Sequence, residues 1–259
     1  MNENRRGLWG FGIILGISLI VAVVIVGNVI DYVKTYNNSV ITVTGVAIKK
    51  VESNDVKWRS TITENAGPSA ADLESASRRM HADLDQVLSY FKENGVTASE
   101  ITVSPLRVNP VYRTSNGMYA GKFYGGMSGT LTGYSLSEDI VVESANVAGV
   151  TGVARSASQY LVGQGIVFAS QNPEYFISES TLNSIRNAML DKALANARSQ
   201  AEAITEGVGA SVGNLRSSSV GVTQITAVNS TNISNYGYYD TTSMEKLITY
   251  LVHATFTMK

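Results

Sequence analysis

One short motif in the chain has the residue types and spacing of a hydrolase nucleophile. The run Gly209-Ala210-Ser211-Val212-Gly213 matches G-x-S-x-G, in which a tight turn holds a serine hydroxyl above a sheet. That turn needs a strand before the serine and a helix after it. Here a helical pattern precedes Ser211 and a strand pattern follows it, so the order is reversed. The sequence therefore favours a helix-to-strand turn, and hydrolysis by Ser211 is the weakest of three functional hypotheses.

The two histidines, His81 and His253, are the next residues that could do chemistry. Neither has a second histidine or a cysteine nearby, and the chain contains no cysteine at all. A zinc site would therefore need carboxylates brought together from distant positions. The sequence indicates surface or interface histidines, and we expect no metal and no cofactor.

Acidic pairs and a glycine run complete the candidates for chemistry. Asp83 with Asp85, and Glu138 with Asp139, are more typical of solvated faces than of an acid–base pair. The glycines between Gly207 and Gly213 do not follow a strand and open a helix, as a dinucleotide fingerprint requires. No catalytic constellation is assembled, so we predict that the protein is not an enzyme.

Charge and composition narrow the possible partners. The net charge is −1 and only 16% of the residues are charged. Acidic and basic residues are scattered, whereas nucleic-acid binding needs clustered Lys and Arg. We therefore expect no nucleic-acid partner, and a weakly charged surface is compatible with burial against copies of the same chain.

An uncharged run from Leu8 to Ile30 precedes the rest of the chain, with Ser18 and Asn28 as its polar side chains. About 20 apolar residues suffice to cross a bilayer, so the run predicts a transmembrane helix. A cleaved signal peptide is the alternative, but the run is longer than a signal core and lacks a small-x-small cleavage site. We therefore assign residues 1–34 to a cytoplasmic tail and a membrane anchor in contact with the lipid bilayer.

The flanks of this run predict its orientation. Arg5 and Arg6 precede it, while Asp31 and Lys34 follow it. The positive-inside tendency then places the N-terminus in the cytoplasm and residues 35–259 in the periplasm or outside the cell. The expected localisation is the plasma (inner) membrane, crossed once. Gly12 and Gly16 have the G-x-x-x-G spacing that lets two helices approach closely.

Hydrophobic periodicity predicts alternating strands and helices downstream of the anchor. A helix of about 25 residues follows the N-cap candidate Ser69 and ends at Asn94-Gly95, and an alanine-lined helix covers about 181–208. A glycine- and aromatic-rich stretch over 114–129 indicates an exposed hairpin or loop. Residues 229–242 form a second aromatic loop. The predicted strands lie at about 40–45, 56–63, 101–110, 130–143, 165–178, 212–228 and 247–258, with another helix at about 147–162.

The order of these elements predicts an α+β fold with helices packed on mainly antiparallel sheets. The two halves have a similar β/α order, which suggests two related β-α-β subdomains at about 40–126 and 127–259, split near Gly126.

Several stretches together resemble the SIMPL domain family, which includes periplasmic immunogenic proteins and predicted oxidative-stress defence proteins. They include Ile41-Thr42-Val43-Thr44-Gly45, Asn94-Gly95-Val96 and Pro110-Val111-Tyr112, and the alanine-rich helix from Ala188 to Gly207 followed by Gly213. The resemblance implies an extracytoplasmic α+β protein without an established enzymatic activity. At least one relative assembles into a ring-shaped, channel-like oligomer. The retained anchor and the Tyr-rich loop depart from the common pattern.

The leading hypothesis is a membrane-anchored protein that self-assembles into a ring- or cage-like oligomer with a structural or envelope-organising role. A low-order binding module for a glycan, peptide or partner protein in envelope stress response is the alternative, with the same aromatic loops holding the ligand. The candidate contact residues are Gly12, Gly16, Tyr119, Phe123, Tyr124, Tyr236, Tyr238 and Tyr239.

Overall fold

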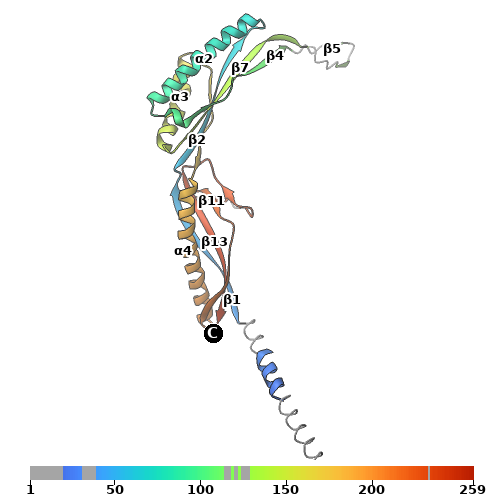
Figure 1. Ribbon diagram of the computed structural model, residues 1–259, viewed down its shortest axis with the longest axis vertical. Helices are drawn as coiled ribbons and strands as arrows, with labels where there is room; N and C mark the ends of the chain where they lie inside the picture. Colours follow the sequence, from blue (N-terminus) through green and yellow to red (C-terminus); the bar gives the residue numbers. More distant parts are fainter. Residues whose placement is uncertain (1–19, 31–38, 114–117, 120–121, 124–128, 233) are drawn as a thin grey trace, which may run out of the picture.

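The computed structural model describes residues 20–30, 39–113, 118–119, 122–123, 129–232 and 234–259 of the chain. They form a mixed α/β fold with two main sheets, called here sheet A and sheet B. The predicted α+β fold of two consecutive β-α-β subdomains is therefore wrong, because each sheet takes strands from both sides of Gly126. The two sheets follow one another along the long axis of the molecule, and helices cover one face of each (Figure 1). The fold is therefore an elongated body made of two layered halves.

The predicted membrane anchor is corrected by the structure. Residues 20–30 form a helix with exposed apolar side chains. No helix in the described parts of the chain is long and apolar enough to cross a membrane. The single-pass topology and the inner-membrane localisation predicted from Leu8 to Ile30 are therefore wrong on this finding; residues 8–19 of that run lie outside the described residues.

Sheet A contains the first and the last strands of the folded region. Its order is β1-β13-β11-β12, and β10 also pairs with β13. β1 and β13 are antiparallel from Val40 opposite Thr257 to Glu52 opposite Glu245. The elements of this half are β1 (Val40–Glu52), α4 (Glu179–Glu206), β10 (Val212–Val220), β11 (Gln224–Ala227), β12 (Tyr238–Tyr239) and β13 (Glu245–Met258).

The predicted alanine face of α4 is confirmed, and it packs on sheet A. Ala193, Ala197 and Ala201 are fully buried against β1 and β13. Gly45 of β1 lies directly under this face: a Cβ there would be 1.9 Å from the Ala193 carbonyl oxygen. Small side chains on both surfaces therefore let the helix backbone approach the strand closely.

We predict that Gly45→Ala destabilises the protein by about 1–3 kcal/mol, because the methyl group overpacks a contact made by backbone. Chemical unfolding followed by circular dichroism measures the change. Gly152→Ala is the matched control, since a Cβ there meets nothing within 4 Å and the position is helical. The control should be neutral or stabilised by about 0.5–1 kcal/mol; equal unfolding free energies for the two variants would contradict the prediction.

Sheet B has the order β3-β7-β2-β8, with β4 paired to β7 and β9 paired to β2. β2 and β7, which come from either side of Gly126 in the sequence, are antiparallel from Val56 opposite Ser144 to Ala66 opposite Tyr134. The elements of this half are β2 (Asp55–Ala66), α2 (Ala70–Glu93), a 3-10 turn (Ala98–Glu100), β3 (Ile101–Val103), β4 (Arg107–Arg113), β7 (Thr130–Ser144), α3 (Val147–Gly163), β8 (Phe168–Ser170) and β9 (Glu174–Phe176).

The sequence explains where α2 begins and which side chains form the core between sheet B and its helices. Ser69 is the N-cap of α2 and forms a capping box with Asp72, as its position predicts. The core is centred on Trp58, whose ring centroid lies 5.0 Å from that of Phe91 and 6.2 Å from that of Phe168. The indole N–H of Trp58 donates to Ser170 Oγ at 2.9 Å, so this buried ring also has its polar partner.

The chain crosses between the two halves twice, at residues 53–54 and at residues 177–178. Asn54 ties the crossings together: its amide nitrogen donates to Ser178 Oγ at 2.8 Å, and its amide oxygen accepts from Ser178 N at 2.7 Å. The amide nitrogen also donates to Thr181 Oγ1 in the first turn of α4 at 3.0 Å. One side chain therefore fixes both crossings and the start of α4.

Candidate functional site

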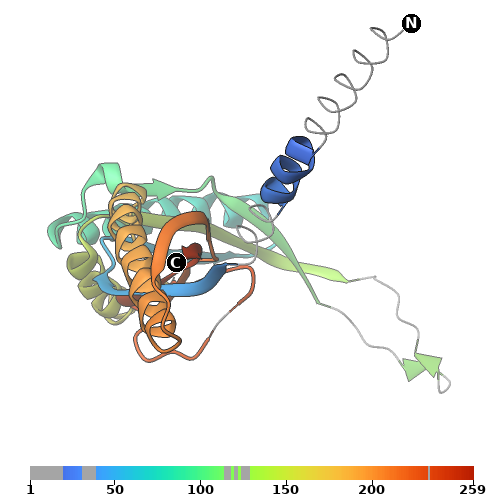
Figure 2. The ribbon, with the colours of Figure 1, turned by 90° about the horizontal axis from the view of Figure 1, so that it is seen from below.

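We call β4 with residues 130–137 of β7 the arm. Residues 134–137 also pair with β2, and beyond the end of β2 the arm continues as a two-stranded ribbon of residues 111–113 and 130–133 that projects from sheet B (Figures 1 and 2). Every residue of β4 is exposed. Its apolar members Val108, Val111 and Tyr112 are 41%, 44% and 57% exposed. Tyr112 lies opposite the half-buried Leu131, and Val108 lies opposite Leu136, which is buried in the core. The exposed apolar contact area of the arm is therefore on β4.

The arm also carries a basic charge. The sequence holds no Asp or Glu between Glu100 and Glu138, whereas Arg107, Arg113 and Lys122 fall in that interval. Arg107 donates to Asp139 at 2.7 Å at the base of the arm. This bond, followed by one from Thr61, lowers the pKa of Asp139, so the carboxylate stays charged and fixes the base of the arm to sheet B.

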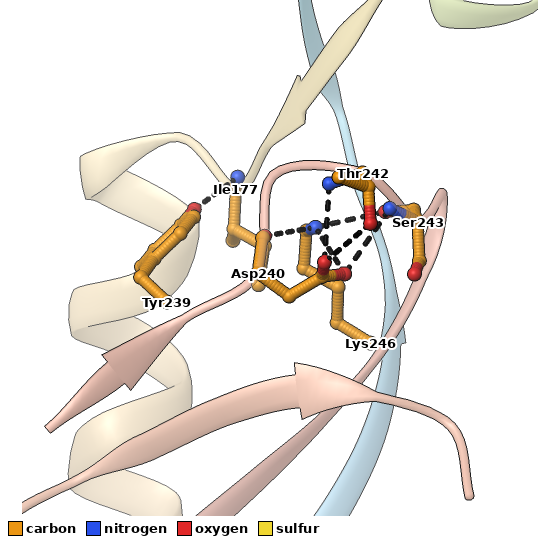
Figure 3. Close-up of polar contacts among 6 residues, drawn as sticks. All are labelled: Ile177, Tyr239, Asp240, Thr242, Ser243 and Lys246. Carbon is orange, nitrogen blue, oxygen red and sulfur yellow. Dashed lines mark hydrogen bonds and ion pairs between the residues drawn. The ribbon is translucent and has the colours of Figure 1, made fainter. Parts of the chain in front are cut away.

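The second candidate region is the aromatic loop after β11, whose end is held by a buried ion pair (Figure 3). Lys246 of β13 is fully buried and donates to the carbonyl oxygens of Asp240 at 2.5 Å and Ser243 at 2.8 Å. It also lies 3.4 Å from the Asp240 carboxylate. We call Lys246 with Asp240 and Ser243 the latch.

The latch carboxylate is held charged by its neighbours. Burial alone would raise the pKa of Asp240, but donors from Thr242 and Ser243 and the charge of Lys246 outweigh burial and lower it. Thr242 donates through its backbone N and its hydroxyl, and Ser243 through its backbone N. Burial lowers the pKa of Lys246, and the Asp240 charge opposes that shift.

The latch positions the loop at the junction of the two halves. Tyr175 N of β9 donates to the Thr241 carbonyl at 2.8 Å. Ile177 N donates to the Tyr239 hydroxyl at 2.8 Å, as Figure 3 shows. The turn after β12 therefore contacts the second crossing, and the latch keeps that turn in place.

The predicted contact residues lie in different environments. Tyr236 is 98% exposed at the tip of the aromatic loop. Tyr238 and Tyr239 form β12, and the Tyr239 hydroxyl is already occupied by Ile177 N. Tyr119 and Phe123 lie in the paired strands β5 (Met118–Tyr119) and β6 (Lys122–Phe123) beyond the arm. Gly12, Gly16 and Tyr124 lie outside the described residues.

Among the residues considered for chemistry, His81 and Glu138 are close enough for the charge of His81 to act on Glu138, and they form no catalytic set with Ser211 or His253. Ser211 lies in the turn between α4 and β10, as the reversed order predicts. His81 is exposed on α2, 4.0 Å from Asp85, and His253 Nδ1 is 2.9 Å from Thr44 Oγ1. In the parts of the chain that the structure describes, no group of three His, Cys, Asp or Glu side chains could hold a metal ion.

Glu138 is partly buried, whereas the sequence predicted that it lies on a solvated face. Its Oε2 atom is buried and has no hydrogen-bond partner among the described residues. Burial raises the pKa of Glu138, although the charge of His81 opposes the shift. The alternation of β7 places Glu138 on the same side as the buried residues Leu136 and Ile140, which explains its burial.

The latch is the feature that pattern reading missed. Lys246 occupies an inward position in β13, in phase with Ile248, Tyr250 and Val252. A lysine in phase with core residues indicates a buried, paired charge, since an unpaired one would be too costly. The run from Asp240 to Ser243 is typical of an Asp-led turn, and the two signals together would have predicted the pair.

We predict that Lys246→Met costs about 3–5 kcal/mol of unfolding free energy, because it removes the counter-charge of a buried carboxylate and the donor of two carbonyl oxygens. Urea unfolding measures the loss, and the double variant with Asp240→Asn should recover part of it. Lys50→Met is the control, since Lys50 pairs with Glu245 at 2.8 Å on the surface of the same sheet and should cost under about 1 kcal/mol. Equal costs at positions 246 and 50 would show that the latch stabilises nothing.

We further predict that Glu138→Gln raises the melting temperature at pH 7. A carboxyl whose pKa is raised by folding contributes stability at low pH and loses it as pH rises from the unfolded pKa through the folded one. The variant should therefore flatten the fall in stability that the wild type shows as pH rises above the ordinary pKa of a glutamate. Thermal unfolding across pH tests this, with Glu143→Gln on the exposed side of the same strand as the control; parallel pH profiles for wild type and Glu138→Gln would refute it.

Comparison with known proteins places the whole folded region in one family. Residues 41–252 match the model of the SIMPL family, described as a protein of unknown function (DUF541). A search of curated proteins found no match. The matched region runs from β1 to β13 and so includes both sheets, the arm and the latch. Because the match covers most of the chain, the protein belongs to the SIMPL family.

Proposed function

We propose that this SIMPL-family protein self-associates into a discrete ring- or cage-like oligomer with a structural role, and that the arm is its main contact element. The observation that carries the proposal is that every residue of β4 is exposed, including the apolar residues Val108, Val111 and Tyr112. Clustered exposed apolar side chains of this kind mark interaction sites more often than single ones do.

The strand arrangement adds a second reason. β4 pairs only with β7 among the described strands, so its outer edge presents backbone donors and acceptors. Pro110 removes one of these donors, which limits uncontrolled growth of the sheet along that edge. The outer edge of β4 thus combines apolar side chains with a row of backbone donors that is broken at Pro110. Such an edge favours a specific contact over open-ended aggregation.

The direction in which the arm projects affects which kind of oligomer it can form. The arm projects sideways from an elongated body (Figure 2). A contact between this arm and a different surface of the next copy is head-to-tail, and such contacts close into rings when the rotation per copy allows it. A contact between two arms would instead give a dimer.

Light scattering of the full chain tests the proposal. We expect a single high-order mass for the wild type, and at least a tenfold weaker association for Val111→Asp with Tyr112→Asp, because charges in an apolar contact cost over about 1.4 kcal/mol. A mild detergent during the measurement covers the exposed apolar helix of residues 20–30.

Val162→Asp is the matched control, since Val162 is an exposed valine on α3, away from the arm. It should leave the mass unchanged. A monomeric wild type would overturn the proposed oligomer, and an oligomer unaffected by the arm variant would overturn the role of the arm.

A further inference from the structure

A pocket lies on the face of sheet A opposite α4. Its volume is about 390 Å³, within the range of sites for small ligands. Leu247, Thr249 and Leu251 of β13 line its floor, because the odd-numbered residues of that strand face away from α4. Asn232 and Asn235 of the aromatic loop line its wall.

The wall of the pocket is held in place by the sheet beneath it. Gln224 of β11 donates from its amide nitrogen to the Ser234 carbonyl at 2.6 Å and accepts from Ser234 N at 3.3 Å. Asp240 N donates to the Ile225 carbonyl at 2.8 Å, and the latch fixes the same turn. The loop is therefore tied to the sheet on either side of Tyr236, and the pocket is a built feature.

Several polar groups in the pocket have no partner within the described chain. Thr226 is only 6% exposed and lines the pocket, and its hydroxyl bonds to none of the residues that the structure describes. The same holds for the side chains of Thr249, Asn232 and Asn235. These hydroxyl and amide groups are therefore available to form hydrogen bonds with a ligand that enters the pocket.

The charge of the lining limits the ligand class. No Asp, Glu, Lys or Arg is among the described residues that line the pocket. His253 is the one titratable side chain among the described lining residues, so a charged ligand would lose its hydration there without meeting a permanent opposite charge. Amides and hydroxyls both donate and accept, so a neutral ligand with several hydroxyl groups can satisfy them together.

We propose that this pocket binds an uncharged saccharide unit. The two leucines offer an apolar surface to a sugar ring, while the threonine hydroxyls and asparagine amides bind its hydroxyl groups. Tyr236, fully exposed and adjacent to Asn235, supplies a ring at the rim for the next unit of a longer chain.

An extended peptide fits the pocket less well. Peptides that add to a sheet need an open strand edge with backbone groups in register. Here the floor is the face of β13, whose two sides are paired with β1 and with β10 and β11. The contacts available to a ligand come from side chains, which favours the saccharide.

Nuclear magnetic resonance of the Leu methyl groups in the full chain tests the proposal. The probes are maltotriose and N,N′,N″-triacetylchitotriose as neutral saccharides, trigalacturonate as a charged one, and an Ala-Ser-Asn tripeptide. We expect saturable shifts of the Leu247 and Leu251 methyls with at least one neutral saccharide, at concentrations up to about 10 mM, and none with the other two probes.

The variants Thr249→Lys and Asn235→Asp should each weaken that binding at least tenfold. Thr255→Lys is the control, on the same face of β13 and about 20 Å away, and should bind as the wild type does. Asn235→Asp leaves the sheet untouched, so its loss of binding cannot come from misfolding. No saturable shift with either neutral saccharide, shifts with the tripeptide alone, or unchanged affinity in both pocket variants would overturn the proposal.

Discussion

Asn54 is the residue on which the relation between the two halves depends. Its amide bonds the start of α4 while the chain on both sides of it passes from β1 to β2. Ser53 N, next to it, donates to the Met244 carbonyl at 2.8 Å, just before β13. Three segments far apart in sequence therefore meet at one turn. The elongated body acts as a unit because both crossings share these hydrogen bonds, and the arm and the pocket are presented at fixed positions on it.

The latch also acts at the junction of the two halves. It holds the turn whose Thr241 carbonyl accepts from Tyr175 N of β9, next to Tyr239 of β12, whose hydroxyl accepts from Ile177 N of the second crossing. The same turn ends the loop that forms the pocket wall. A buried ion pair is costly to form, and its retention here fits a role in fixing one conformation of the turn. Assembly through the arm and binding in the pocket would therefore involve separate surfaces of one rigid frame.

The sequence predicts those parts of the fold that depend on neighbours along the chain. The Ser69 cap, the alanine face of α4 and the helix-to-strand turn at Ser211 follow from spacing alone, and the structure confirms them. Strand partners are different, because alternation indicates which side chains face the core but not which strand lies beside them. The pairing of β1 with β13 and the roles of Asn54 and Lys246 depend on contacts across long separations. The anchor predicted from Leu8 to Ile30 was inferred from hydropathy, which measures composition, and no helix in the described residues is long and apolar enough to cross a membrane.

The pairing of β1 with β13 has a consequence for how the chain reaches this structure. β1 is the first strand of the folded region, and β13 is the last and its sole partner among the described strands. During synthesis, β1 cannot pair until β13 has been made. Sheet B, whose strands all lie between β2 and β9, can form first. Pairing of two strands so far apart in sequence is slow, because the chain between them loses conformational entropy before the strand contacts form and offset that loss. Folding should therefore proceed from the middle of the chain outward, and a nascent chain that ends before Glu245 would leave sheet A open.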